Sequence, residues 1–174
     1  MTSSILIITG MPGAGKTRLA LALANRLMDL NRPVLVLHTD VLKVTLRRVG
    51  LEGLKGPTWR GDTALKLQRI RPVLDHHVAK ARRDGYHLII EGTLALGYRP
   101  TSSVHALLEL PEAARLQRIR HKHASARASL EVSPDEPLER YRKLLSEAVR
   151  PDTVHLNAEV PIDALVSSLL ARLP

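Results

Sequence analysis

The sequence predicts an α/β fold in which helices cover both faces of a parallel sheet of about five strands. Three observations lead to this prediction. Short aliphatic runs, typical of strands buried on both faces, alternate with longer segments whose apolar residues recur every three or four positions. A glycine-rich turn follows the first aliphatic run. The chain has 174 residues, 44% of them hydrophobic and 25% charged, which fits one globular domain over residues 1–174.

The chain begins with a strand, a helix and a second strand. The first strand is predicted over residues 5–8, and from Thr17 an amphipathic helix continues to about residue 30. Residues 34–37 form the next aliphatic run and are predicted as a second buried strand. Two short strands joined by one helix form a right-handed βαβ unit, so the sheet is expected to be parallel.

The later segments continue this alternation. The predicted elements are a helix over 41–49, a glycine-rich loop over 51–62, a helix over 63–83 with a possible kink at Pro72, a strand over 87–91, a strand over 104–110, a basic helix over 111–122, a helix over 138–149, a strand over 153–156 and a helix over 162–173. Residues 125–137 are polar and too weakly patterned to assign.

Composition narrows the class of partner. Twenty-six Lys and Arg against seventeen Asp and Glu give a net charge of +9, which favours a phosphate ester, a nucleotide, nucleic acid or an acidic membrane surface. Aromatic residues make up only 2% and Phe is absent, which argues against base-stacking platforms. Cysteine is absent too, so disulfides and Cys-ligated metals are excluded. With no signal-like start and no long apolar stretch, a cytoplasmic protein without a membrane partner is expected.

Residues 10–17 read Gly-Met-Pro-Gly-Ala-Gly-Lys-Thr and match the motif G-x-x-x-x-G-K-[ST]. The motif lies between a strand and a helix, where backbone N–H groups and the helix N-terminus can surround phosphates. Lys16 is expected to bridge the β and γ phosphates of a nucleotide, and the Thr17 hydroxyl to bind Mg²⁺. The expected nucleotide contacts are Gly10, Pro12, Gly13, Ala14, Gly15, Lys16, Thr17 and Arg18.

This motif resembles the Walker A loop of P-loop NTPases, and the whole chain is similar to the P-loop kinases. The resemblance implies a three-layer αβα P-loop kinase fold with ATP and Mg²⁺ as cofactors. It also implies transfer of the γ-phosphoryl group to a hydroxyl or phosphate of a small, anionic acceptor. Residues 85–94, Gly-Tyr-His-Leu-Ile-Ile-Glu-Gly-Thr-Leu, are similar to the third-strand segment of the zeta-toxin kinases. They are more loosely similar to that of 2-phosphoglycerate kinases, which residues 38–43 also resemble.

The resemblance assigns roles to two acidic residues. Asp40 follows the second strand, so its carboxylate faces the crevice at the strand end and is expected to orient the acceptor hydroxyl and take its proton. The alternative is that Asp40 caps a helix beginning at residue 41. Glu91 is expected to hold a water on Mg²⁺ or to orient the substrate, and Thr93 to bond the acceptor. The alternative for Glu91 is a strand-end carboxylate paired with a nearby arginine.

The basic helix after the fourth strand carries Arg115, Arg118, Arg120 and Lys122, and Arg127 follows it. P-loop kinases commonly carry an arginine-bearing lid here, over about 115–137 in this chain, whose guanidinium groups cover the transferring phosphoryl group. Arg118 and Arg127 are the leading candidates. Arg120 lies about 200° around the helix from Arg118, so part of this charge is a solvated face.

The remaining assignments are by analogy. Asn157 precedes the last helix, where kinases of this group often wrap the adenine. The acceptor is expected between residues 41 and 72, a region that includes Arg47, Arg48, Trp59 and Arg60. A nucleic-acid 5′-end kinase stays open as an alternative, although the chain lacks a concentrated basic stripe outside the lid. A regulatory P-loop ATPase or GTPase is the other alternative, and the chain has no N-K-x-D guanine motif. The oligomeric state is left open.

Overall fold

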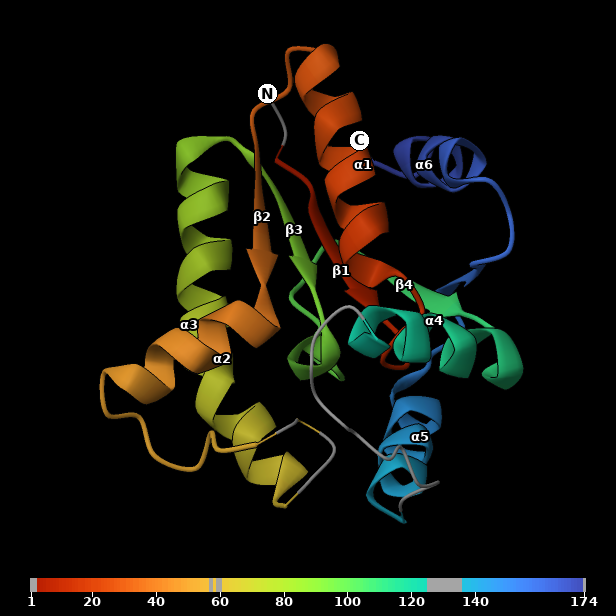
Figure 1. Cartoon of the computed structure of the whole chain (residues 1–174). Helices are drawn as coiled ribbons and strands as arrows, with labels where there is room; N and C mark the ends of the chain where they lie inside the picture. The colour runs from red at the N-terminus through yellow and green to blue at the C-terminus, as the bar shows by residue number, and fades with distance from the viewer. Residues whose placement is uncertain (1–2, 57, 59–60, 125–135, 174) are drawn as a thin grey trace.

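The computed structural model describes residues 3–56, 58, 61–124 and 136–173 (Figure 1). Within them, five parallel strands form one sheet in the order β2-β3-β1-β4-β5. The strands are β1 (Ile5–Thr9), β2 (Val34–His38), β3 (His87–Glu91), β4 (Ser103–Glu109) and β5 (Val154–Asn157). The helices are α1 (Lys16–Asp29), α2 (Thr39–Arg48), α3 (Thr63–Asp84), the 3-10 turn η1 (Thr93–Ala95), α4 (Glu112–Ala124), α5 (Glu136–Ala148) and α6 (Ile162–Leu170). The predicted elements are all found, and only η1 was not predicted.

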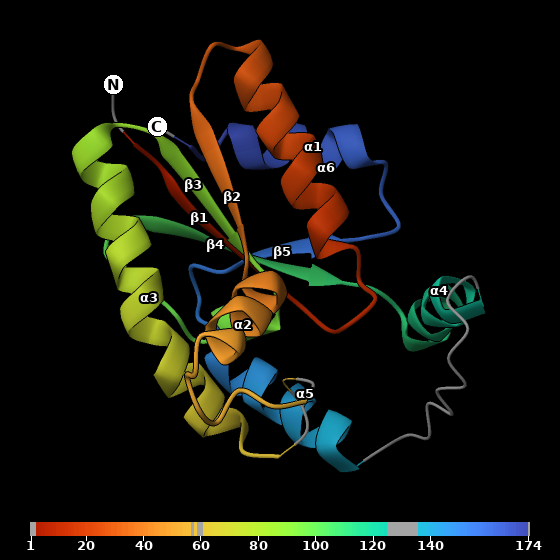
Figure 2. The same cartoon turned by 60° about the vertical axis from the view of Figure 1, so that its left-hand side comes forward.

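Alternate side chains of β1 pack against helices on opposite faces of the sheet. Leu6 and Ile8 pack in the core with α1 and α6, whereas Ile5 and Ile7 pack in a second core with α3. Successive side chains of a strand point to opposite faces, so a fully apolar β1 requires a helical layer on each side. Figure 2 shows α1 and α6 on one side of the sheet and α3 on the other. The predicted three-layer arrangement is confirmed.

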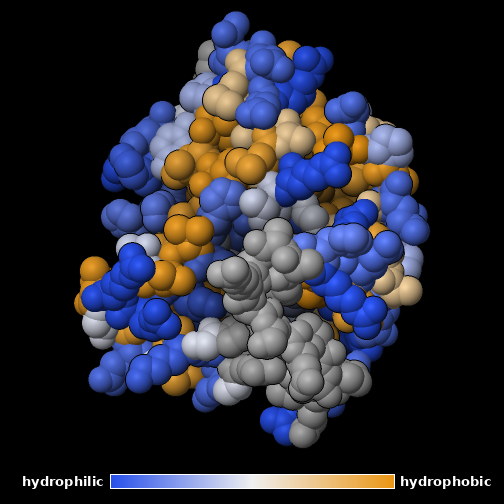
Figure 3. Space-filling model, in the orientation of Figure 1, coloured by the Kyte–Doolittle hydropathy of each residue, from blue (hydrophilic) through white to orange (hydrophobic). Residues whose placement is uncertain are grey.

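The second strand differs from the prediction in its burial. β2 is an edge strand, and Leu35 is 40% exposed, so the expectation of a strand buried on both faces is wrong here. Leu21 and Met28 of α1 are also exposed, and Figure 3 shows apolar surface over α1 and β2. Periodicity indicates a strand but cannot show which strands stand at the edge, because strand order depends on contacts distant in sequence.

The sheet order determines where a ligand can bind. β1 lies between β3 and β4, and the chain crosses through α1 to β2 on one side before it later reaches β4 on the other. Ligands of open α/β sheets bind beyond the carboxyl ends of strands at such a switch point. The glycine-rich loop leaves β1 there, and α2 and η1 begin directly after β2 and β3. No helix among the described residues is both long and apolar enough to span a membrane.

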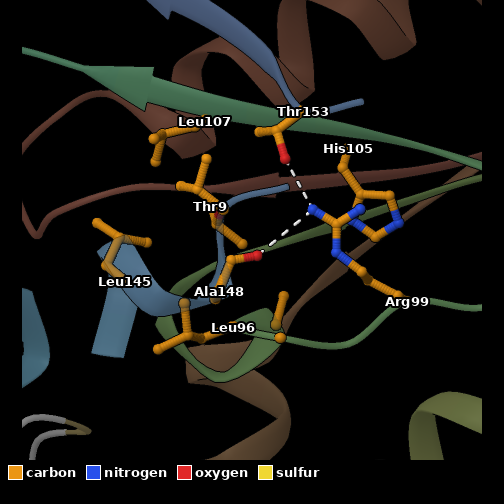
Figure 4. A pocket seen from close by; sticks show the side chains of 11 residues that line it. Thr9, Leu96, Arg99, His105, Leu107, Leu145, Ala148 and Thr153 are labelled. Carbon is orange, nitrogen blue, oxygen red and sulfur yellow. Dashed lines mark hydrogen bonds between the residues drawn. The ribbon is translucent and has the colours of Figure 1, made fainter. Parts of the chain in front are cut away.

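On the side of the sheet that α3 covers, β1 and β4 line a small polar pocket (Figure 4). One of its lining residues, Thr9, directly precedes the glycine-rich loop. The volume of the pocket is about 20 Å³, room for one or two water molecules. Arg99 donates from Nη2 to Thr153 Oγ1 at 2.7 Å and to the Ala148 carbonyl at 3.4 Å. These hydrogen bonds hold the segment before β4 against the end of α5 and the turn before β5. The residues of the pocket therefore stabilise the packing of these segments.

His105 in this pocket makes the free energy of unfolding depend on pH. Burial, and then the nearby Arg99 guanidinium, lower the pKa of His105 from 6.5 to about 4. The unfolded chain therefore binds a proton on this ring over a pH range in which the folded chain does not, and stability falls as pH falls from 6.5 toward 4. Between about pH 7 and pH 5 the wild type should lose about 2 kcal/mol of its free energy of unfolding through His105. We expect His105→Gln, whose side chain can still reach the Ser103 hydroxyl, not to show this part of the loss. Urea unfolding at the two pH values measures this, and an unchanged pH dependence in the variant would contradict it.

Candidate active site

The loop between β1 and α1 has the backbone of a phosphate-binding turn. Gly10, Gly13 and Gly15 all have positive φ, a region that other residues rarely adopt. At Gly13 a side chain is also excluded by α4, because an added Cβ would lie 2.8 Å from Cγ1 of Ile119 and 3.2 Å from Cγ of Arg115. Glycine at position 13 therefore lets α4 pack directly against the loop. Helix α1 begins at the end of the loop, where the N–H groups of its first turn can bind an anion.

Lys16 is held against the same loop. Its side chain is 7% exposed, and Nζ donates to the carbonyl oxygens of Gly10 and Met11, each at 3.0 Å. A phosphate bound in the loop offers this ammonium group an anionic partner, and charge-assisted hydrogen bonds are about twice as strong as neutral ones. The geometry of the loop and of Lys16 thus fits a nucleotide phosphate.

Glu91 connects the loop to the ends of β2 and β3. Thr17 Oγ1 donates to Glu91 Oε1 at 3.1 Å, and His38 Nδ1 lies 2.7 Å from the same oxygen. The Glu91 side chain is 6% exposed. A hydroxyl and a carboxylate are ligands that Mg²⁺ accepts, and Mg²⁺ usually takes few protein ligands beside water and substrate phosphates. Among the described residues, no group of three or more His, Cys, Asp or Glu side chains could hold a metal ion.

Helix α2 begins two residues earlier than predicted, so Asp40 is its second residue. β2 ends at His38 and α2 begins at Thr39, so Asp40 is in the first turn of α2 and not between strand and helix. The N-cap residue is His38, without a side-chain cap, so the alternative that Asp40 caps this helix is not found. The Asp40 side chain is exposed, and its Oδ1 lies 3.4 Å from the Thr93 hydroxyl. An anionic group in a first turn is stabilised by the helix dipole.

Two residues that the sequence analysis did not single out, Thr58 and Tyr141, bond to Thr93 beside Asp40. Thr58 is buried in the loop before α3, and its hydroxyl lies 2.7 Å from that of Thr93. Tyr141 on α5 is fully buried, and its hydroxyl donates to the Thr93 carbonyl at 3.3 Å. Burial raises the pKa of Tyr141, and the nearby Asp40 carboxylate raises it further. Thr93, a predicted acceptor contact, is therefore held from three sides and placed next to Asp40.

A glycine also sets the approach of α2 to β3. Gly92 follows Glu91 with φ 125°, and a Cβ there would lie 2.2 Å from Oγ1 of Thr39. Thr39 is fully buried and accepts from the Leu94 backbone N–H at 3.4 Å. Glycine at position 92 is what allows the end of β3, with Glu91, to lie beside the first turn of α2, with Asp40.

The basic helix α4 lies along the outside of the glycine-rich loop. Arg115 is 2% exposed and donates from Nη1 to the Pro12 carbonyl at 3.4 Å. Arg118 donates to the Ala14 carbonyl at 3.2 Å and to the Ala158 carbonyl at 3.4 Å. Arg118 therefore joins the loop to the turn after β5. Arg115 was not among the leading candidates, although its position one turn before Arg118 places both on one helix face.

The other predicted residues are less informative. Arg127 lies outside the described residues, as do Trp59 and Arg60. Arg18 is exposed on the first turn of α1. The Asn157 side chain accepts from the Glu159 backbone N–H at 2.9 Å, so it shapes the turn that Arg118 contacts.

Removing the Arg118 side chain is expected to weaken nucleotide binding. Arg118→Ala loses both hydrogen bonds that join the loop to the β5–α6 turn, and we expect the KM for ATP to rise about tenfold with a smaller change in kcat. Arg120→Ala is the control, because Arg120 is exposed on another face of the same helix. Steady-state kinetics at varied ATP measure the effect, and an unchanged KM in Arg118→Ala would contradict it.

Fold and site together define a class. Three features are those of a P-loop kinase-like protein: a parallel sheet in this order, a Gly-x-x-x-x-Gly-Lys-Thr loop after β1, and acidic residues in the first turn of α2 and at the end of β3. Residues 2–109, more than half of the chain, match the family model described as Zeta toxin, and the chain belongs to that family. No curated protein matches the chain. The family supports ATP-using phosphotransferase activity of the kinase kind.

Proposed function

We propose that this protein is a kinase that transfers the γ-phosphoryl group of Mg-ATP to a hydroxyl of a small, anionic acceptor. The observation that carries the proposal is the contrast between two carboxylates at neighbouring strand ends. Glu91 is buried and bonded to Thr17 of the loop, whereas Asp40 is exposed and lies beside the Thr93 hydroxyl. Carboxylates in such different surroundings suit different tasks, one on the metal side and one on the acceptor side.

The nucleotide half of the site consists of the glycine-rich loop, Lys16, Thr17 and Glu91. The loop N–H groups and the Lys16 ammonium bind the phosphates, and Thr17 and Glu91 hold Mg²⁺ directly or through water. The bound metal supplies positive charge that neutralises the oxygens of the transferring group. Arg118 keeps the loop joined to the β5–α6 turn, on the side where the rest of the nucleotide would extend.

The acceptor half of the site is centred on Asp40. An acceptor hydroxyl takes the place near Asp40 Oδ1 that the Thr93 hydroxyl approaches now. Asp40 orients this hydroxyl and accepts its proton while the acceptor oxygen bonds to the γ-phosphorus and the bond from that phosphorus to ADP breaks, so that ADP leaves. The neighbouring wall, made of Thr58, Thr93 and Tyr141, is held by its own hydrogen bonds and needs little reorganisation.

Basic residues near Asp40 support an anionic acceptor. Lys43 lies on α2 three residues after Asp40, on the same side of the helix, and donates to the Gly56 carbonyl at 3.1 Å. Lys66 of α3 is buried, and burial followed by the charge of Lys43 lowers its pKa. The electrostatic effect of Lys43 on Lys66 indicates a positive potential in this region. An acceptor that carries a phosphate or a carboxylate would bind favourably there.

The test is transfer of label from γ-labelled Mg-ATP to a panel of hydroxyl compounds, with Lys16→Ala as the blank. The panel contains two pairs of anionic and neutral compounds: nucleotide sugars with free sugars, and sugar phosphates with polyols. It also contains antibiotics and RNA oligonucleotides with a 5′-hydroxyl. We expect label on a small anionic member. Label on RNA alone would contradict the proposal in favour of an end kinase, and phosphate release without an acceptor would favour an ATPase.

A further inference from the structure

His38 makes one of the two shortest hydrogen bonds described above for the site, and none of the roles above uses it. Its Nδ1 atom lies 2.7 Å from Oε1 of Glu91. His38 is the last residue of β2 and stands beside Glu91 in the parallel register of β2 and β3. The contact thus joins two strand ends that are 53 residues apart in the chain, next to the glycine-rich loop.

The direction of this hydrogen bond follows from the chemistry of the two groups. A carboxylate only accepts hydrogen bonds, so Nδ1 of His38 carries the hydrogen and donates it. Thr17 donates to the same oxygen at 3.1 Å, and the hydrogen bonds of Glu91 to described residues all end on Oε1. Rotation of the Glu91 side chain would break both bonds. Two donors on one oxygen therefore fix the carboxylate and the direction of its second oxygen, Oε2.

We infer that His38 is a positioning residue for the magnesium site: it holds the Glu91 carboxylate against Thr17 so that Oε2 is presented to the metal or to a water on it. This inference rests on the proposed function. Groups that hydrogen-bond to a metal's carboxylate ligand orient that ligand, and their loss typically costs about 10- to 100-fold in metal affinity. Loss of His38 is therefore expected to weaken binding of the metal and not of the free nucleotide.

Burial makes the contact with His38 important for Glu91. The Glu91 side chain is 6% exposed, so few water molecules can replace a lost donor. A second His–Glu pair of the same kind provides a comparison. His155 Nδ1 of β5 lies 3.0 Å from Oε2 of Glu109, the last residue of β4, but there both side chains are more than half exposed. Water can therefore replace a partner in that pair more readily than in the His38 pair, in which His38 is 28% exposed and Glu91 is buried.

The experiment compares His38→Asn with His38→Gln, His38→Ala and the wild type. The side-chain amide nitrogen of Asn can take the place of Nδ1, whereas that of Gln lies one bond further out, near the place of Nε2. Mn²⁺ is the probe, and its affinity for the ADP complex is measured from the electron paramagnetic resonance signal of free Mn²⁺. We expect Ala and Gln to weaken Mn²⁺ binding about tenfold or more, and Asn to stay within about threefold of the wild type.

Two further measurements separate positioning from a loss of structure. ADP affinity measured in excess chelator is expected to be the same in all variants, and His155→Ala is expected to leave Mn²⁺ affinity unchanged. If His38→Ala does not fold, as judged by circular dichroism, the comparison of Asn with Gln decides the matter. Equal Mn²⁺ affinities for Asn and Gln would overturn the inference while the proposed function stands. Failure of the wild type to bind ADP would overturn both.

Discussion

Lys16→Ala is expected to lower phosphoryl transfer about a thousandfold. The Lys16 ammonium is buried in the glycine-rich loop and donates to two loop carbonyls at 3.0 Å. Charge develops on the phosphoryl oxygens during transfer, and a preorganised cation stabilises that charge more than it stabilises the ground state. Initial rates with γ-labelled ATP measure the loss.

The control for this variant is Lys80→Ala. Lys80 is an exposed lysine of α3 that forms a surface pair with Asp84, so its removal changes the net charge equally without touching the site. We expect Lys80→Ala to keep wild-type rates. Thermal unfolding of Lys16→Ala shows whether the loop still folds. A folded Lys16→Ala variant with more than a tenth of the wild-type rate would contradict the assignment.

Asp40→Asn is expected to lower turnover about a hundredfold or more while the affinity for ATP changes less than about twofold. Asn has the same shape and can still contact the Thr93 hydroxyl, but it cannot accept the proton of the acceptor. Because Asp40 is proposed to face the acceptor, and Glu91 and not Asp40 bonds to Thr17 beside the loop, the change should appear in kcat and not in nucleotide binding.

Asp163→Asn is a matched control for Asp40→Asn. Asp163 is also an exposed aspartate in the first turn of a helix, α6, so it carries the same interaction with a helix dipole. We expect it to leave kcat unchanged. Full turnover of Asp40→Asn on the true acceptor would mean that Asp40 is neither base nor orienter, whatever the control shows.

The sequence predicted the part of the fold that local patterns specify. The loop over residues 10–17 and α3 carry strong local signals: the glycine spacing in one, and in the other a long apolar period that ends at Gly85 in a left-handed conformation. The burial of β2 was not predictable in this way, because Leu35 is exposed only through the position of its strand at the sheet edge.

In the candidate site, too, the residues marked by local sequence patterns were predicted, and those defined by contacts distant in sequence were not. Lys16, Thr17 and Glu91 were predicted from motifs, and the structure brings them together. His38 and Tyr141 were not predicted as site residues, because each acts through a partner about 50 residues away, and nothing near them in sequence marks that contact. Arg118 was predicted to cover the phosphoryl group, but its described bonds go to backbone carbonyls, a role that depends on how α4 packs on the loop.

The most direct test of the central claim compares ADP formed with phosphoryl groups recovered in an acceptor. Mg-ATP is incubated with the wild type, with and without the acceptor pool, and both products are quantified by mass spectrometry. The proposed kinase should form ADP at least about tenfold faster with the pool, because a bound acceptor hydroxyl is held in position for transfer whereas water is not. Each ADP should be matched by one phosphorylated acceptor. Equal ADP formation with and without the pool, with all phosphate released to water, would contradict phosphoryl transfer as the function of this site.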